Sequence, residues 1–97
     1  MAARVTLSQP AADDLDSIYH YLAAEASPES ADYVLARLFE AMHRTAAFPL
    51  SNRERTDQYG FRRVNVFSFA IFYRADGNDV TVVRVLHSRQ DARRHLR

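Results

Sequence analysis

The main change in the spacing of apolar residues along this chain of 97 residues occurs near Gly60. Between Ser8 and Pro49, apolar side chains recur at steps of three and four residues, the period of a helix with one buried face. After Gly60, aromatic and β-branched residues dominate, as strand positions favour. The sequence therefore predicts helices in the first part of the chain and strands in most of the second.

Two helix-start signals divide the first part of the chain. Ser8 is a good N-cap residue, and Pro10 follows in the first turn, where its missing N–H does no harm. Ser27 and Pro28 repeat this signal, and Pro49 marks where the second helix stops. The two apolar stripes are Ala12, Leu15, Ile18, Tyr19, Leu22 and Ala26, and then Ala31, Val34, Leu35, Leu38, Met42 and Ala46. Helices this close in sequence are expected to form an antiparallel hairpin.

Three acids, Asp13, Asp14 and Asp16, lie near the start of the first predicted helix. Negative charge is favoured there by the helix dipole. We attribute the acids to this effect and not to a metal site.

Strand patterns occur at residues 4–7, 61–67, 69–74 and 80–86. The chain is expected to change direction near Ser68 and again at 76–79, a strong turn signal, whereas 51–59 reads as a loop. The order is β-α-α-β-β-β, which predicts a single α+β domain over residues 1–97. The economical arrangement packs the helical hairpin on one face of an antiparallel sheet and leaves the other face partly open.

Charge is distributed unevenly although the net charge is only +1. Residues 1–50 contain three arginines and seven acidic residues, whereas residues 51–97 contain ten arginines and five acidic residues. The chain has no lysine. Arginine offers a planar fork of donors that suits carboxylate and phosphate groups. A basic second half indicates either an acidic partner, protein or nucleic acid, or simply a solvated surface.

Several function classes receive no support from the sequence. Cysteine is absent, which removes disulfides and thiolate metal sites and fits a cytoplasmic protein. No signal peptide or membrane span is expected. The four histidines are too scattered for a ligand motif, so we expect neither metal nor cofactor.

The residues that could carry chemistry are arginines and one histidine in the strands. If neighbouring strands bring Arg62, Arg84 and His87 onto one open face, arginine clamps and a histidine would suit RNA cleavage by general acid–base chemistry. In the alternative, Arg84 pairs with an acid such as Asp91, and His87 is a strand-end residue bonded to backbone. Both interpretations remain open at this stage.

Three segments, "LSQPAADDLDSIYHYL", "GFRRVNVFSFAIFYRADG" and "VTVVRVLHSRQD", occur in this order and span most of the chain. They resemble the ParE branch of the RelE/ParE superfamily of type II toxin–antitoxin toxins. The most specific part is the pattern from Arg84 to Asp91. The resemblance implies the same β-α-α-β-β-β fold.

The resemblance implies one of two activities. ParE-like toxins inhibit DNA gyrase without catalysis of their own, whereas RelE-like toxins cut mRNA on the ribosome with a basic residue set that includes lysines. The absence of lysine favours the ParE-like activity; Arg62, Arg84 and His87 would be catalytic only in a RelE-like nuclease. The expected target-binding residues are Arg62, Arg63, Arg84, His87, Arg89 and Arg93. A non-toxic relative that only binds a partner is a third hypothesis.

The resemblance also implies a cognate ParD-like antitoxin, through which alone the toxin would reach DNA. Such an antitoxin wraps an acidic, amphipathic segment around the toxin, which suits a basic second half and an apolar hairpin surface. The expected antitoxin contacts are Leu15, Tyr19, Leu35, Phe39 and Arg74.

Overall fold

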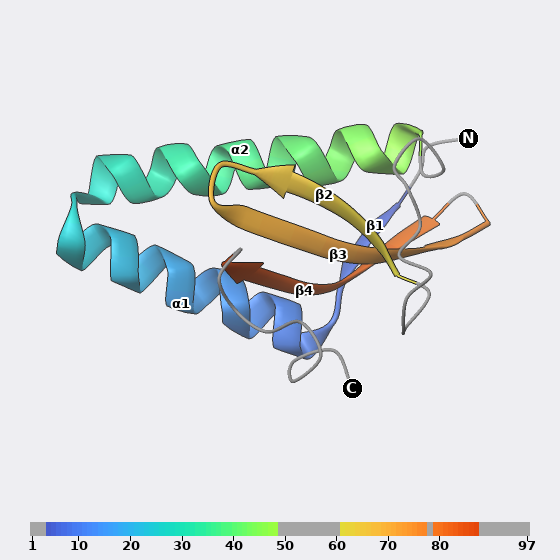
Figure 1. Ribbon diagram of the computed structural model, residues 1–97, viewed down its shortest axis with the longest axis horizontal. Coiled ribbons are helices and arrows are strands. Elements are labelled where there is room, and N and C mark those ends of the chain that lie inside the picture. The colour runs from blue at the N-terminus through green and yellow to red at the C-terminus, as the bar shows by residue number, and fades with distance from the viewer. Residues whose placement is uncertain (1–3, 49–60, 78, 88–97) are drawn as a thin grey trace.

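The computed structural model describes residues 4–48, 61–77 and 79–87. Two antiparallel helices lie on one side of a four-stranded sheet (Figure 1). The elements are β1 (Val5–Leu7), α1 (Gln9–Glu25), α2 (Pro28–Ala47), β2 (Arg62–Val66), β3 (Phe69–Asp76) and β4 (Asp79–His87). The predicted α+β class and element order are confirmed.

Both helices begin at the serine caps that the sequence predicts. The Ser8 hydroxyl accepts from the Ala11 N–H at 3.1 Å, and the Ser27 hydroxyl accepts from the Ser30 N–H at 3.0 Å. Each cap satisfies one N–H that the helix itself leaves unpaired. The second helix ends at Ala47, with Phe48 as its C-cap, next to the predicted stop at Pro49.

The sheet has the strand order β1-β4-β3-β2 and is mixed, so the prediction of a purely antiparallel sheet is wrong. Strands β2, β3 and β4 form the expected antiparallel meander, but β1 pairs with β4 in parallel over Val80–Val82. Short turns force antiparallel pairing only between consecutive strands. Strand β1 is separated from β4 by both helices and by strands β2 and β3, so no hairpin turn sets its direction.

Two turns of the meander contain residues with positive φ. Phe67 and Ser68 form a two-residue hairpin loop between the paired residues Val66 and Phe69, and Phe67 has φ +54°. The favoured two-residue hairpin loops require a positive φ at their first residue, but a bulky residue rarely adopts a positive φ. Gly77, with φ +63°, fills the same need without strain in the turn predicted at 76–79.

The main core lies between the helices and the sheet. Its fully buried members include Leu38 and Met42 of α2 and Ile71, Tyr73 and Val85 of the sheet. In α1 the buried stripe is Ala11 and Leu15, so Ala11 takes the place predicted for Ala12, and Ala26 at the end of the stripe is exposed.

The opposite face of the sheet carries a second apolar cluster. Ala70, Phe72 and Leu86 are each at most 2% exposed, with Phe61 and Val83 packed against them. The expected open face is therefore wrong at these positions. Successive side chains of a strand point to opposite faces, so Phe72 and Tyr73 serve different clusters.

Candidate functional site

The arginine that interrupts the last strand is bound by a carboxylate of the first helix. Asp14 Oδ2 accepts from Arg84 Nε at 2.7 Å, and Asp14 Oδ1 accepts from Arg84 Nη2 at 2.7 Å. This two-bond geometry is the strongest form of a carboxylate–guanidinium pair. The side chain of Asp14 is only 14% exposed and that of Arg84 only 19%, so solvent screens their charges weakly.

The environment of Arg84 favours its charged form. The hydrogen bond to Asp14 raises the pKa of Arg84, partial burial lowers it, and the charge of Asp14 raises it again, with a net upward shift. The guanidinium therefore stays protonated at any physiological pH.

Two sequence interpretations change with this pair. The expectation that the helix dipole accounts for Asp13, Asp14 and Asp16 is wrong, because no acid lies in the first turn of α1, where the dipole acts. Asp14 instead binds Arg84. The alternative in which Arg84 is paired with an acid of this chain is confirmed in kind, with Asp14 as the acid that the structure shows. Asp91, the example given from sequence, lies outside the described residues.

The N-cap of α1 and Asp14 also bind the backbone of β4. Pairing between β3 and β4 passes from Phe72–Arg84 to Tyr73–Val82, so Val83 is an extra residue that forms a β-bulge. The Ser8 hydroxyl donates to the Val83 carbonyl at 2.7 Å. Asp14 Oδ2 accepts from the Val85 N–H at 3.0 Å. Below, "the β4 clamp" means Ser8 and Asp14 with Val83, Arg84 and Val85.

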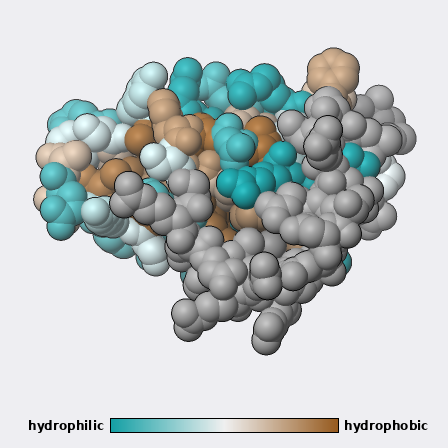
Figure 2. All heavy atoms as spheres, in the orientation of Figure 1, coloured by the Kyte–Doolittle hydropathy of each residue, from teal (hydrophilic) through white to brown (hydrophobic). Residues whose placement is uncertain are grey.

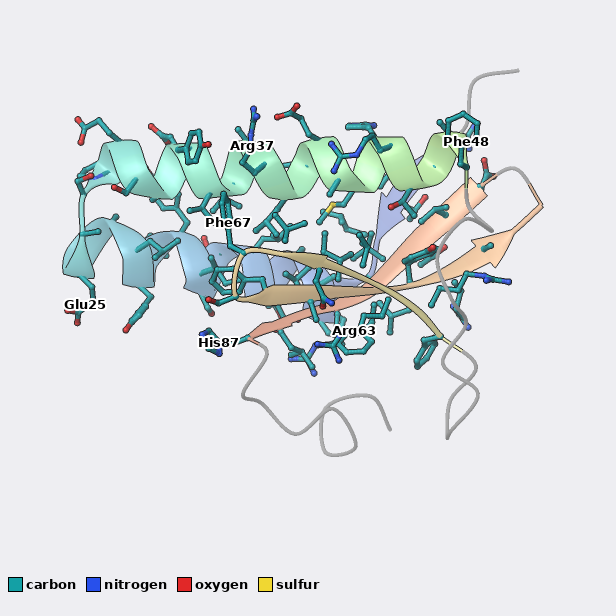
Figure 3. The ribbon with its side chains drawn as sticks, turned by 45° about the horizontal axis from the view of Figure 1, so that its top comes forward. Glu25, Arg37, Phe48, Arg63, Phe67 and His87 are labelled. Carbon is teal, nitrogen blue, oxygen red and sulfur yellow. The ribbon has the colours of Figure 1, made fainter. Side chains whose placement is uncertain are left out.

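A second arginine lies in the same row of residues paired across the strands as Arg84. Arg63 pairs with Phe72, which pairs with Arg84. The Arg63 Nε donates to Asn65 Oδ1 at 2.8 Å, and its guanidinium carbon lies 5.4 Å from the centre of the Phe72 ring. Figure 3 shows Arg63 on the side of the sheet away from α2. An arginine over a ring in this way makes a cation–π contact.

His87 ends β4 beside an apolar groove. Its ring meets that of Phe69 edge to face, with centroids 5.6 Å apart. The groove has a volume of about 520 Å³ and runs between α1 and the ends of β3 and β4. Its other lining residues are Ser17, Ile18, Tyr21, Leu22 and Ser68.

The expectation that Arg62, Arg84 and His87 share one open face is wrong. Arg62 is in the row of Tyr73, and His87 is in the row of Phe69, four residues away along β3. At about 3.3 Å per residue, the two rows are roughly 13 Å apart. Arg84 is opposite Phe72, whose side chain belongs to the other face. Arg89 and Arg93 lie outside the described residues.

The predicted antitoxin contacts fall into three environments. Leu15 is 5% exposed and belongs to the core, so its prediction as a contact residue conflicts with its burial. Leu35 and Phe39 lie one turn apart on α2; Leu35 is partly buried, and Phe39 is 39% exposed. Tyr19 of α1 is also partly buried, and it lies nearly as many residues before the connection between the two helices as Leu35 lies after it. Arg74 is exposed and alternates with Tyr73, so it lies on the opposite face of the sheet from the hairpin.

The sequence analysis missed an exposed aromatic surface at the tip of the β2–β3 hairpin. Phe67 points toward α2 (Figure 3), and its ring lies 6.1 Å from that of Tyr33. Arg37 lies over the same Tyr33 ring, 5.4 Å from its centre, and pairs with Glu40. Figure 2 shows hydrophobic residues between the two helices on this side of the molecule. The positive φ of Phe67 had no signal in the sequence, because bulky residues are rare in this conformation.

Asp14 and Ser8 were also missed as partners of β4. The available signal was Arg84 itself, because a charge inside a buried strand needs a nearby counter-charge. No periodic pattern says which acid supplies it. In the parts of the chain that the structure describes, His, Asp and Glu residues form no group that could hold a metal ion. The helices described are also too short or too polar to cross a membrane.

Comparison with known families gives a match over most of the chain. A family model described as the ParE toxin of the type II toxin–antitoxin system parDE matches residues 5–92. Toxin ParE3 of Caulobacter vibrioides is 32% identical over 89 residues, which cover 91% of this chain and 89% of that protein. Toxin ParE1 of Mycobacterium tuberculosis is 34% identical over 98 aligned positions, covering 99% of this chain and all of that protein.

Two solved structures share the fold. A chain from the chromosomal ParDE system of P. aeruginosa has a TM-score of 0.76 at 20% identity, covering 89% of this chain and 96% of that chain. A chain from the RelBE2 toxin–antitoxin complex of Mycobacterium tuberculosis has a TM-score of 0.60 at 19% identity, covering 90% of this chain and 99% of that chain. At these identities the likeness shows the fold alone.

Proposed function

Because this chain belongs to the ParE toxin family of type II toxin–antitoxin systems, we propose that it arrests growth by inhibiting DNA gyrase and that a cognate ParD-like antitoxin neutralises it. A gyrase inhibitor acts in the cytoplasm and needs no catalytic residues of its own. It requires a surface that binds gyrase and prevents the enzyme from completing its cycle.

The observation that supports inhibition over RNA cleavage is the separation of the candidate catalytic residues. A nuclease needs its acid, base and charge-stabilising groups within hydrogen-bond reach of one phosphate. Arg62 and His87 lie in rows four residues apart, and Arg84 is bound by Asp14. This arrangement offers no shared phosphate site, whereas a protein inhibitor has no such requirement.

A supercoiling assay with purified gyrase tests the proposed target. We expect the purified chain to stop supercoiling and to accumulate cleaved DNA, and the antitoxin to reverse both effects. Supercoiling that continues at excess toxin would contradict gyrase as the target. Cleavage of ribosome-bound mRNA in a parallel assay would instead favour the nuclease.

The antitoxin is proposed to bind the outer seam of the helical hairpin at Tyr19, Leu35 and Phe39. Exposed or half-buried apolar side chains at helical spacing suit an amphipathic partner segment. We expect Phe39→Asp to reduce copurification with the product of the neighbouring gene, because a carboxylate would replace an apolar contact. Phe48→Asp is the matched control, since Phe48, the C-cap of the same helix, is also an exposed aromatic residue but lies outside the proposed seam.

A further inference from the structure

On the edge of β4 that faces β1, the last residues of the strand contact the start of α1 instead of a neighbouring strand. Strand β1 pairs with β4 only at Val80, Thr81 and Val82. From Val83 onward, the partners on that side come from Ser8 and Asp14. The Ser8 N–H donates to the Val82 carbonyl at 2.9 Å, which marks where strand pairing gives way to contacts with the helix end.

The end of β1 makes these partners necessary, because beyond Leu7 no strand among the described residues pairs with this edge of β4. The bulge at Val83 adds a local bend to β4 at the same place. Partly buried backbone groups without partners are costly, so the Val83 carbonyl and the Val85 N–H need other partners. Ser8 donates to the carbonyl, and Asp14 accepts from the N–H, within four residues of the strand's end at His87.

Asp14 couples the backbone to Arg84 through one carboxylate. Its Oδ2 atom accepts from both the Val85 N–H and Arg84 Nε, while Oδ1 accepts from Arg84 Nη2. The side chain of Arg84 and the main chain after it are therefore fixed to the same point on α1. An arginine held in this way is better placed to orient its strand than to bind a separate anion.

We propose that Asp14 is a positioning residue for the target-binding end of β4. By holding the bulge and Arg84, it fixes the direction in which the strand presents His87 to the target, without touching the target itself. The inference rests on the proposed function, because it assigns a role in toxicity to a residue of the β4 clamp.

The test compares Asp14→Asn with Asp13→Asn in the full chain. Asp13 is exposed and adjacent in sequence, and within the described part of the chain it accepts a hydrogen bond from the Gln9 side chain at 3.0 Å. The control therefore makes the same charge change outside the clamp. We expect Asp14→Asn to copurify with the antitoxin but to lose growth arrest when expressed without it. Asp13→Asn should arrest growth like the unmodified chain.

A second readout follows the mechanism directly. Hydrogen exchange at the Val85 amide should accelerate about tenfold in Asp14→Asn, the size expected for loss of a hydrogen bond to a charged acceptor. Ser27→Ala removes the cap of α2 far from β4 and controls for general loss of stability. It should leave growth arrest unchanged and accelerate Val85 exchange by no more than roughly fivefold, the effect that losing one helix cap has on global unfolding.

If Asp14→Asn does not fold, Asp14→Glu takes its place, since it keeps the charge but moves the carboxylate by one methylene. Full growth arrest by either folded Asp14 variant, with fast Val85 exchange, would overturn the inference. Stronger arrest would overturn it too, because Arg84 would then be a target contact that Asp14 masks. An unmodified chain that arrests growth but leaves gyrase active refutes only the proposed target.

Discussion

At the scale of single residues, the Asp14–Arg84 pair decides what the charged part of β4 can do. Arginine in a buried strand is expected either to point outward or to be paired. Here it is paired through two short bonds with a carboxylate 70 residues earlier in the chain. The guanidinium therefore contributes to folding and cannot be counted as a free cation for an acidic partner.

Arg84→Gln should lower the free energy of unfolding by about 2 kcal/mol, because Asp14 loses a charge-assisted partner in a poorly solvated position. Urea denaturation measures this change. Arg37→Gln is the control, since Arg37 is in a more exposed pair with Glu40 one turn along the helix. Its loss should cost less than about 1 kcal/mol, and equal costs for the two substitutions would contradict the special role of the Arg84 pair.

The raised pKa of Arg84 predicts how that difference varies with pH. A cation whose pKa is higher in the folded state stabilises the fold fully below its ordinary pKa and loses this effect only as the pH rises through the higher value. The stability difference between the unmodified chain and Arg84→Gln should therefore be the same at roughly pH 7 and pH 9. Urea titrations at both values check this, and a difference that vanishes at the higher pH would contradict it.

At the scale of elements, the start of α1 acts on β4 as well as on its own helix. Ser8 is predictable as a cap from its position before Pro10. Its donation to Val83 is not predictable, because it depends on a bulge 75 residues later. One hydroxyl thus links the start of the first helix to the last strand.

Ser8→Ala should therefore destabilise the protein more than Ser27→Ala. Each substitution removes a helix cap, which costs about 1 kcal/mol. Ser8→Ala also leaves the partly buried Val83 carbonyl without that donor, which adds on the order of 1 kcal/mol. Thermal denaturation of the two variants measures the difference, and equal melting temperatures would show that the bond to Val83 contributes nothing.

At the scale of the whole molecule, the sheet is apolar on both faces. The helical hairpin covers one face and forms the main core with it. The other face carries Ala70, Phe72 and Leu86, which are as deeply buried as the main core. The fold therefore has two hydrophobic clusters that share the same three-stranded meander.

Phe72→Ala tests the energetic weight of the second cluster. We expect it to lower the free energy of unfolding by about 3 to 4 kcal/mol, the range for removing a buried aromatic ring. Phe67→Ala is the control, because Phe67 is 60% exposed and should cost far less. Chemical denaturation measures both, and a small effect at Phe72 would mean that this cluster is only loosely packed.

Local patterns were sufficient for the element order, the serine caps, the turns at Ser68 and 76–79, and the resemblance to the ParE family. These features depend on neighbours within a few residues, which periodicity and turn chemistry report directly. The site was less predictable. Arg84 was recognised as a residue in need of explanation, but its grouping with Arg62 and His87 was wrong because strand register determines which side chains meet.

The sequence by itself determined which segments become helices and strands, because those preferences are local. Only the tertiary structure decided the parallel pairing of β1, the bulge at Val83 and the choice of Asp14 as the partner of Arg84. Each of these joins residues about 70 positions apart or depends on register between strands. Such contacts form only when the whole chain packs, so no local pattern encodes them.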